Sequence, residues 1–144
     1  MKKTVTIIAS IGAFLLIGGL IVVWAVYQKN DDVKKSHLVK DFTDENFESD
    51  VVLASTKMPI LVDFYAEWCM PCRMLQPIIE QVAADVKDKA IIGRLDTDKN
   101  LISRKLGINK IPAVWIIRDG QVKKSFFGVV PKDKILEALR EQGS

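Results

Sequence analysis

The sequence predicts an α/β domain, a mixed central sheet flanked by helices, preceded by one N-terminal transmembrane helix. Two observations lead to this fold class. After residue 38, short apolar stretches rich in β-branched residues alternate with stretches whose apolar residues recur at helical spacing. Before it, 24 consecutive residues from Thr4 to Tyr27 carry no charge. The 144 residues therefore have room for one globular domain and an appendage.

The uncharged N-terminal stretch has the length of a membrane span. A helix of 24 residues would be about 36 Å long and could cross a hydrocarbon core of about 30 Å with some tilt. A cleavable signal peptide is the main alternative, and a buried core helix is another. The stretch is longer than the roughly 7–15 residues of a signal-peptide core. It ends in Trp24 and Tyr27, which suit a membrane interface, and lacks a small-residue cleavage pattern.

We therefore expect residues 1–28 to be a retained signal-anchor, 29–38 a polar tether and 39–144 the folded domain. Lysines lie on both sides of the predicted span, so loop charge does not decide its orientation. A short basic tail followed by an apolar stretch resembles an export signal. We expect a single-pass protein of the cell membrane whose domain lies outside the cytoplasm.

The distribution of charge gives no sign of a nucleic-acid partner. The formal net charge is +3, and residues 1–37 account for all of it, with five lysines against two aspartates. The remaining residues hold 16 basic and 16 acidic side chains. The excess lysines flank the predicted span, where they can meet anionic headgroups, and no basic groove is implied.

The domain is expected to run strand, helix, strand, helix, strand, helix, strand, strand, helix. Residues 43–46 resemble a helix N-cap with acids in the first turn, and an amphipathic helix is expected from there to about Ser55. Pro59 ends it before an apolar, β-prone strand at Ile60–Tyr65. The next helix is expected from Arg73 to about Val86.

The second half of the domain is expected to contain three strands and two helices. In chain order these are the strand Ala90–Leu95, the helix Leu101–Leu106, the strands Ala113–Ile117 and Val122–Phe127, and the helix Lys132–Gln142. Asp119-Gly120 is a strong hairpin signal, so the last two strands should pair. Together the elements predict a mixed sheet covered by helices.

The two cysteines of the chain, Cys69 and Cys72, lie between the strand Ile60–Tyr65 and the helix that follows. Two thiols separated by two residues can close to a disulfide and reopen, exchanging two electrons. Unpaired backbone N–H groups and the helix dipole at this position favour an accessible thiolate. The alternative is half of a tetrahedral zinc site, but His37 is the only other residue of the usual soft-ligand types. We predict a redox site without metal.

A longer set of residues resembles the thioredoxin family. The resemblance covers about Leu38 to Glu141. The matching residues, in the family's order, are Val62-Asp63-Phe64-Tyr65-Ala66-Glu67-Trp68-Cys69, Pro71-Cys72-Arg73-Met74, Pro77, Ile111-Pro112, Asp119-Gly120 and Phe127-Gly128. The resemblance implies a thioredoxin fold and a Cys69–Cys72 disulfide. It implies that Cys69 attacks a client disulfide and that Cys72 resolves the mixed disulfide.

Asp63 is the candidate general acid/base. It lies in a strand that should be buried on both faces, and burial raises the pKa of a carboxyl. The resemblance implies that it accepts the proton of Cys72 through a water; a strand-end aspartate in contact with water is the alternative. Arg94 stands where the family commonly carries lysine. Its guanidinium keeps its proton, so it can tune Asp63 without exchanging protons, unless it is an ordinary surface arginine.

The resemblance also implies a client-binding surface. Pro112 matches a cis-proline that faces the cysteines, and the backbone of Ile111 before it could pair with an extended client segment. Trp68 would form a flat exposed surface beside the thiol, with ordinary packing as the alternative. Gly128 would let the client backbone approach closely.

Three residues depart from the family's usual pattern. Met70 replaces glycine between the cysteines and adds a flexible apolar side chain. Ala113 replaces threonine, and Lys110 replaces a small residue and could bring positive charge to the rim of the groove. These departures bear on the range of substrates more than on the chemistry.

The predicted function is a membrane-tethered thiol-disulfide oxidoreductase that reduces protein disulfides without a cofactor. Related oxidases often carry histidine before the second cysteine, whereas Pro71 occupies that place here, as in reducing thioredoxins. A disulfide oxidase or isomerase, or a thioredoxin-fold binding module with incidental redox activity, are the alternatives. The expected partners are disulfide-containing envelope proteins, including apocytochromes awaiting haem, and a membrane electron donor.

Overall fold

The computed structural model of this protein describes residues 38–143. The predicted signal-anchor and nearly all of the predicted tether lie outside the described residues. None of the helices formed by residues 38–143 is both long enough and apolar enough to span a membrane.

Five strands form one mixed sheet in the order β1-β3-β2-β4-β5. The strands are β1 (Val39–Phe42), β2 (Ile60–Tyr65), β3 (Ile91–Asp96), β4 (Ala113–Arg118) and β5 (Gln121–Phe127). β3 pairs in parallel with β1 and with β2, whereas β4 is antiparallel to both β2 and β5. The predicted mixed sheet is confirmed, and β2 has the predicted bounds.

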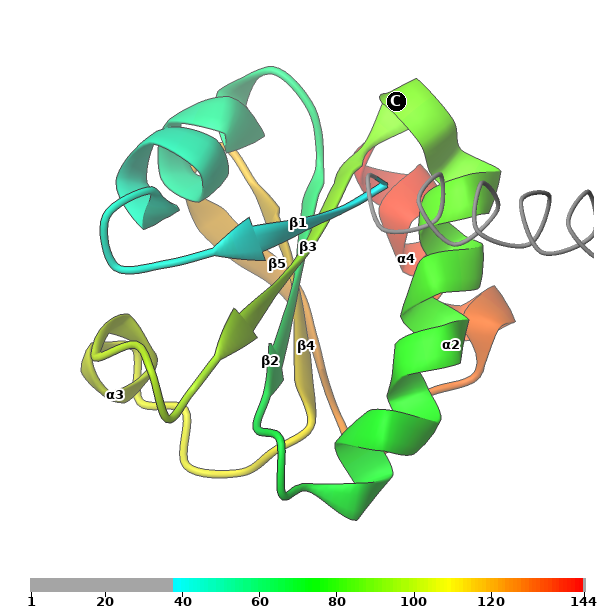
Figure 1. The fold of residues 1–144 in the computed structure, drawn as a ribbon. Coiled ribbons are helices and arrows are strands. Elements are labelled where there is room, and N and C mark those ends of the chain that lie inside the picture. The colour runs from blue at the N-terminus through cyan, green and yellow to red at the C-terminus, as the bar shows by residue number, and fades with distance from the viewer. Residues whose placement is uncertain (1–37, 144) are drawn as a thin grey trace, which may run out of the picture. The chain divides into compact units, whose positions relative to one another are not determined.

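Helices cover both faces of this sheet (Figure 1). One face carries α2 (Met70–Val86) and α4 (Lys132–Gln142), which pack on Leu61, Ile92 and Ile116. The other face carries two short helices, η1 (Glu48–Leu53) and η2 (Ala54–Thr56), and α3 (Ile102–Lys105). A hydrophobic core lies on each face of the sheet. Strand residues contribute to the two cores in turn, because successive side chains of a strand point to opposite faces.

The first helical segment differs from the amphipathic α-helix that the sequence predicts. η1 is a π-helix and η2 a 3-10 helix. Phe47 and Val51 are both buried and lie four positions apart, a spacing that the wider turn of a π-helix keeps on one side. The Ser55 hydroxyl also accepts the Gly120 N–H at 2.8 Å, so this segment contacts the β4–β5 turn.

α2 begins at Met70, three residues before the predicted start. Its N-cap is Cys69, whose sulfur accepts the backbone N–H of Cys72 at 3.3 Å, and Pro71 lies in the first turn. Proline is favoured there because its missing N–H would have had no partner in the helix. The helix continues through Pro77 to Val86.

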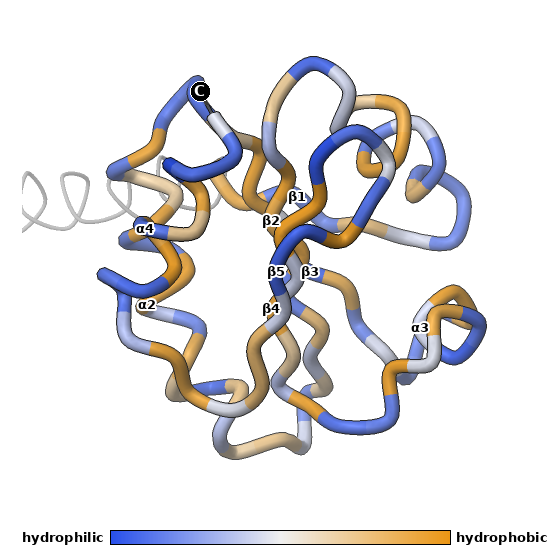
Figure 2. The backbone as a smooth tube through the Cα atoms, turned by 180° about the vertical axis from the view of Figure 1, so that it is seen from behind, coloured by the Kyte–Doolittle hydropathy of each residue, from blue (hydrophilic) through white to orange (hydrophobic). Residues whose placement is uncertain are grey.

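The predicted hairpin joins β4 to β5 through Asp119 and Gly120, both at positive φ. β5 lies at one edge of the sheet and is coloured hydrophilic over much of its length (Figure 2). Lys123 and Lys124 are exposed on it, and lysines discourage a further strand from pairing with an open edge.

Gly93 lies in the middle of β3, opposite Val62 of β2 and Lys40 of β1. A Cβ at this position would overlap the ring of Phe42. Phe42 is 1% exposed, so its ring has little room to move. The absence of a side chain at Gly93 therefore lets β1 pack its only fully buried residue against the sheet.

Candidate active site

Cys69 and Cys72 lie where the C-terminal end of β2 leads into the N-terminus of α2. Their sulfurs form a disulfide of 2.09 Å with the Cα atoms 5.3 Å apart. In this disulfide form Cys69 is 4% and Cys72 1% exposed. Both cysteines are therefore largely buried while the disulfide is closed, and Cys69, the expected attacking thiolate of the reduced form, is the more exposed of the two.

A groove of about 590 Å³ runs beside Cys69. It is lined by Trp68, Cys69, Met70, Pro71, Asn109, Lys110, Ile111, Pro112, Phe127 and Gly128. The four residues predicted to bind the client, Trp68, Ile111, Pro112 and Gly128, thus meet at one groove, although they come from three separate segments. The Ile111–Pro112 peptide bond is cis, as the sequence resemblance implied. Gly128 has φ of 79°, a conformation that favours glycine.

Asp63 lies inside the sheet, on β2, six residues before Cys69. Its side chain is fully buried, and neither carboxyl oxygen has a hydrogen-bond partner among the described residues. Burial raises the pKa of Asp63 to about 7, against the opposing effect of the Arg94 cation. This carboxyl therefore changes protonation state near neutral pH. The alternative of a strand-end aspartate in contact with water is wrong.

Arg94 is the register partner of Asp63 on the neighbouring strand β3. Its guanidinium carbon lies 3.9 Å from the centroid of the Tyr65 ring, within the range of a cation–π contact. The Nε atom is buried and has no hydrogen-bond partner among the described residues. Arg94 also lines a second pocket, of about 320 Å³, together with Cys72 and Arg73. It is thus more enclosed than an ordinary surface arginine.

Comparison with known proteins agrees with this geometry. The thioredoxin family model matches residues 38–141. The chain is 39% identical over 101 residues to a thioredoxin of Rickettsia bellii, covering 69% of this chain and 94% of the relative. It is 44% identical over 100 residues to thioredoxin 2 of Chlorobaculum tepidum, covering 69% of this chain and 90% of the relative.

The chain belongs to the thioredoxin family. The family and the Cys69–Cys72 pair at disulfide distance make it a thiol-disulfide oxidoreductase. The comparisons cover the folded domain and leave the N-terminal stretch unmatched.

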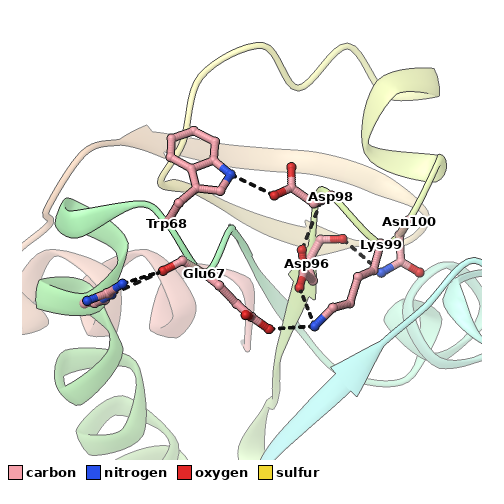
Figure 3. Close-up of polar contacts among 7 residues, drawn as sticks. Glu67, Trp68, Asp96, Asp98, Lys99 and Asn100 are labelled. Carbon is pink, nitrogen blue, oxygen red and sulfur yellow. Dashed lines mark hydrogen bonds and ion pairs between the residues drawn. The ribbon is translucent and has the colours of Figure 1, made fainter.

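The sequence analysis missed a hydrogen bond of Trp68 and the ion pairs beside it (Figure 3). The indole N–H donates to the Asp98 carboxylate at 2.7 Å, although the Trp68 residue is 69% exposed. Next to it, Lys99 bridges Glu67 at 2.7 Å and Asp96 at 3.1 Å. The residues on the β3 side lie directly after the strand predicted at Ala90–Leu95. In the structure β3 is parallel to β2, so both strands end at the same edge of the sheet, a pairing that the sequence analysis did not predict.

No metal centre accompanies the cysteine pair in the part of the thioredoxin domain that the structure describes. Residues 38–143 contain no cluster of three or more His, Cys, Asp or Glu side chains able to hold a metal ion. His37, the chain's single histidine, lies outside the described residues.

Proposed function

We propose that this thioredoxin-family chain is a membrane-tethered reductase of protein disulfides. The observation that carries the direction of electron flow is the surroundings of Cys69. A strong oxidant needs a reduced form with a heavily stabilised thiolate. Here the intervening residues are Met70 and Pro71, and the next cation along the chain, Arg73, donates to the Glu67 carbonyl oxygen at 3.2 and 2.9 Å. The N-terminus of α2 is therefore the main group that stabilises the Cys69 thiolate. This favours a low reduction potential for the Cys69–Cys72 pair.

The exchange proceeds in two steps in which electrons and protons balance. The Cys69 thiolate attacks one sulfur of the client disulfide, forms a mixed disulfide and releases the other client sulfur as a thiolate that takes a proton. The Cys72 thiolate then attacks the Cys69 sulfur, closes the Cys69–Cys72 disulfide and releases the second client thiol. The client gains two electrons, and the protein dithiol loses them.

Asp63 serves the second step as general base. With a pKa of about 7, its carboxylate can take the proton of Cys72 near neutral pH, and its lack of hydrogen-bond partners leaves it free to do so. Arg94 opposes the effect of burial on this pKa. Trp68, Ile111, Pro112 and Gly128 hold the client segment in the groove beside Cys69, and Met70 and Pro71 modulate the site.

The membrane tether is proposed from residues 4–27, which carry no charge. With its domain outside the cytoplasm, the protein receives electrons from a membrane carrier and passes them to oxidised envelope proteins. Carbonate washing of membranes tests the tether: the full-length chain should stay in the pellet, and its release would contradict the proposal. Protease added to intact cells with a permeable outer barrier should digest the domain if it faces outward.

The exchange mechanism is tested by trapping in native membranes. Full-length Cys72→Ala should accumulate mixed disulfides through Cys69 because the resolving thiol is gone, and mass spectrometry of the adducts should identify the clients. The matched control, Cys69→Ala with Cys72→Ala, should give none. A complete absence of reducible adducts in Cys72→Ala would contradict the proposed exchange mechanism.

The direction is tested by the reduction potential of the Cys69–Cys72 pair. We expect a value close to that of reducing thioredoxins, about −270 mV, measured against a glutathione or dithiothreitol buffer. A value near −120 mV, typical of a strong oxidant, would favour the oxidase instead.

A further inference from the structure

The groove beside Cys69 carries one charged side chain. Nine of its ten lining residues are apolar, uncharged polar or cysteine, and the tenth is Lys110. Lys110 is exposed and lies in the segment between α3 and β4. This segment runs past the same end of the sheet as the start of α2 (Figure 1). Lys110 therefore belongs to the rim along which a client would lie.

The charge of Lys110 is not neutralised by the domain. Its side chain makes no ion pair and no hydrogen bond with any of residues 38–143. Asp98 is not among the residues that line the groove, and its carboxylate accepts the Trp68 indole N–H at 2.7 Å. The neighbouring cation Lys99 is paired with Glu67 and Asp96. The groove lining thus contains one unpaired positive charge and no acid, and the nearby carboxylates of Glu67 and Asp96 are paired with Lys99.

The rest of the groove is apolar and exposed. Trp68, Met70 and Phe127 are 69%, 62% and 60% exposed, and they surround the opening above Cys69. Large exposed apolar side chains gathered in this way are typical of a protein-binding surface. An apolar client segment would cover them, and a carboxylate on that segment would meet Lys110, the one charged residue among those that line the groove.

We propose that Lys110 makes this thioredoxin domain prefer client disulfides that have an aspartate or glutamate within a few residues of the attacked cysteine. The inference rests on the proposed reductase function and names the client class of the same groove. An exposed ion pair contributes about 0.2–1 kcal/mol, which corresponds to a rate ratio of about 1.4 to 5. The preference is therefore a bias among clients and not an absolute requirement.

The test uses the full-length reduced chain and a set of disulfide-linked peptides of one sequence. An apolar peptide carries Glu, Gln or Lys at each of the three positions on either side of its cysteine. Single-turnover reduction is followed by acid quenching and chromatography, so that peptide thiol and protein disulfide are both counted. We expect the Glu peptide to react about 1.4 to 5 times faster than the Gln peptide at one or two positions, and the Lys peptide to react more slowly.

Two charge-reversal variants make the test specific. Lys110→Glu should invert the order, so that the Lys peptide becomes the fastest. Lys89→Glu changes the net charge equally in η3 (Lys87–Lys89), which precedes β3 and so lies at the opposite end of the sheet from the groove, and it should keep the wild-type order. In 1 M salt the Debye length falls to about 3 Å and the ratio should approach one.

The outcomes separate this inference from the function on which it rests. Reduction of all three peptides at equal rates, or an unchanged order in Lys110→Glu, would overturn the role of Lys110 and leave the reductase in place. A full-length dithiol that reduces none of the peptides would overturn the proposed reductase and the inference with it.

Discussion

Two aspartates of this domain show opposite uses of the same side chain. Asp63 is fully buried on β2 with no hydrogen-bond partner among the described residues. Asp44 is exposed and accepts the backbone N–H groups of Leu101 and Ile102 at 2.9 and 2.8 Å, which joins the loop after β1 to the start of α3. A carboxylate that accepts well-placed hydrogen bonds stabilises the fold. A buried carboxyl without donors lowers the stability of the fold, and the proposed role of Asp63 in disulfide exchange explains why it is retained.

The two carboxyls also respond to pH in opposite directions. The pKa of Asp44 is lowered, first by the Ile102 N–H and then by the Leu101 N–H. Its stabilising effect is therefore present above the ordinary carboxyl pKa of 3.8 and is lost as the pH falls through the lowered value. Burial raises the pKa of Asp63 to about 7. The folded state therefore favours the protonated form of Asp63. The contribution of Asp63 to stability is fully present below about pH 4 and is lost as the pH rises through about 7.

The largest effect is expected from Asp63→Asn, which keeps the shape of the side chain and removes its charge. At pH 8.5 the variant should be more stable than the wild type, by up to about 4 kcal/mol for a pKa displaced by about 3 units. At pH 4 the two should be equally stable. Urea unfolding of the disulfide form at both pH values measures the difference.

The same Asp63→Asn variant should resolve mixed disulfides slowly and without the pH dependence near 7 that the wild-type carboxylate confers. A variant that is no more stable than the wild type at pH 8.5 would mean that Asp63 is solvated, and the contrast with Asp44 would fail.

Asp44→Ala is expected to change the stability of the domain less than Asp63→Asn does, and to lower it. Loss of both N–H contacts at the start of α3 should lower the melting temperature by roughly 3–8 °C at pH 7 and leave the pH profile of disulfide exchange unchanged. Asp133→Ala removes an exposed aspartate from the first turn of α4, where no side chain makes a cap bond, so it is the control and should change the melting temperature less. Calorimetry distinguishes the two; equal melting temperatures would deny Asp44 its structural role.

The smallest effect is expected at Arg94. Arg94→Met removes the cation that opposes the effect of burial at Asp63 and keeps most of the apolar stem, so the pKa of Asp63 should rise above its value of about 7. Arg94→Lys retains the positive charge and should shift the pKa of Asp63 less. Carbon-13 NMR titration of the carboxyl measures both. A fall in the pKa after Arg94→Met would show that the guanidinium acts on Asp63 through something other than its charge.

Much of the fold could be predicted because local patterns decide it. The run Ile60–Tyr65 and the helix Lys132–Gln142 have the predicted bounds, since each is an uninterrupted strand or helix pattern between clear breakers. The helix before β2 was predicted with the wrong geometry. Its turns depend on how Phe47 and Val51 fit against the sheet, which periodicity alone does not contain.

Part of the candidate site could likewise be predicted from local sequence, and part of it depends on the assembled sheet. Cys69, Cys72 and Asp63 could be found because they lie within ten residues of one another, and the burial of Asp63 followed from its apolar neighbours. The Trp68–Asp98 and Glu67–Lys99 contacts span 30 and 32 residues. They exist only because β2 and β3 run in parallel and end at the same edge, so they follow from the completed sheet and not from any local signal.

Gly93 limits how this domain can vary. A single added methyl group there would collide with the Phe42 ring, and Phe42 ends the strand that leads, two residues later, to Asp44. Repacking that ring would displace β1 and with it the carboxylate that caps α3. A substitution at Gly93, in the middle of β3, should therefore weaken the Asp44 contacts at the start of α3 although it lies on another element.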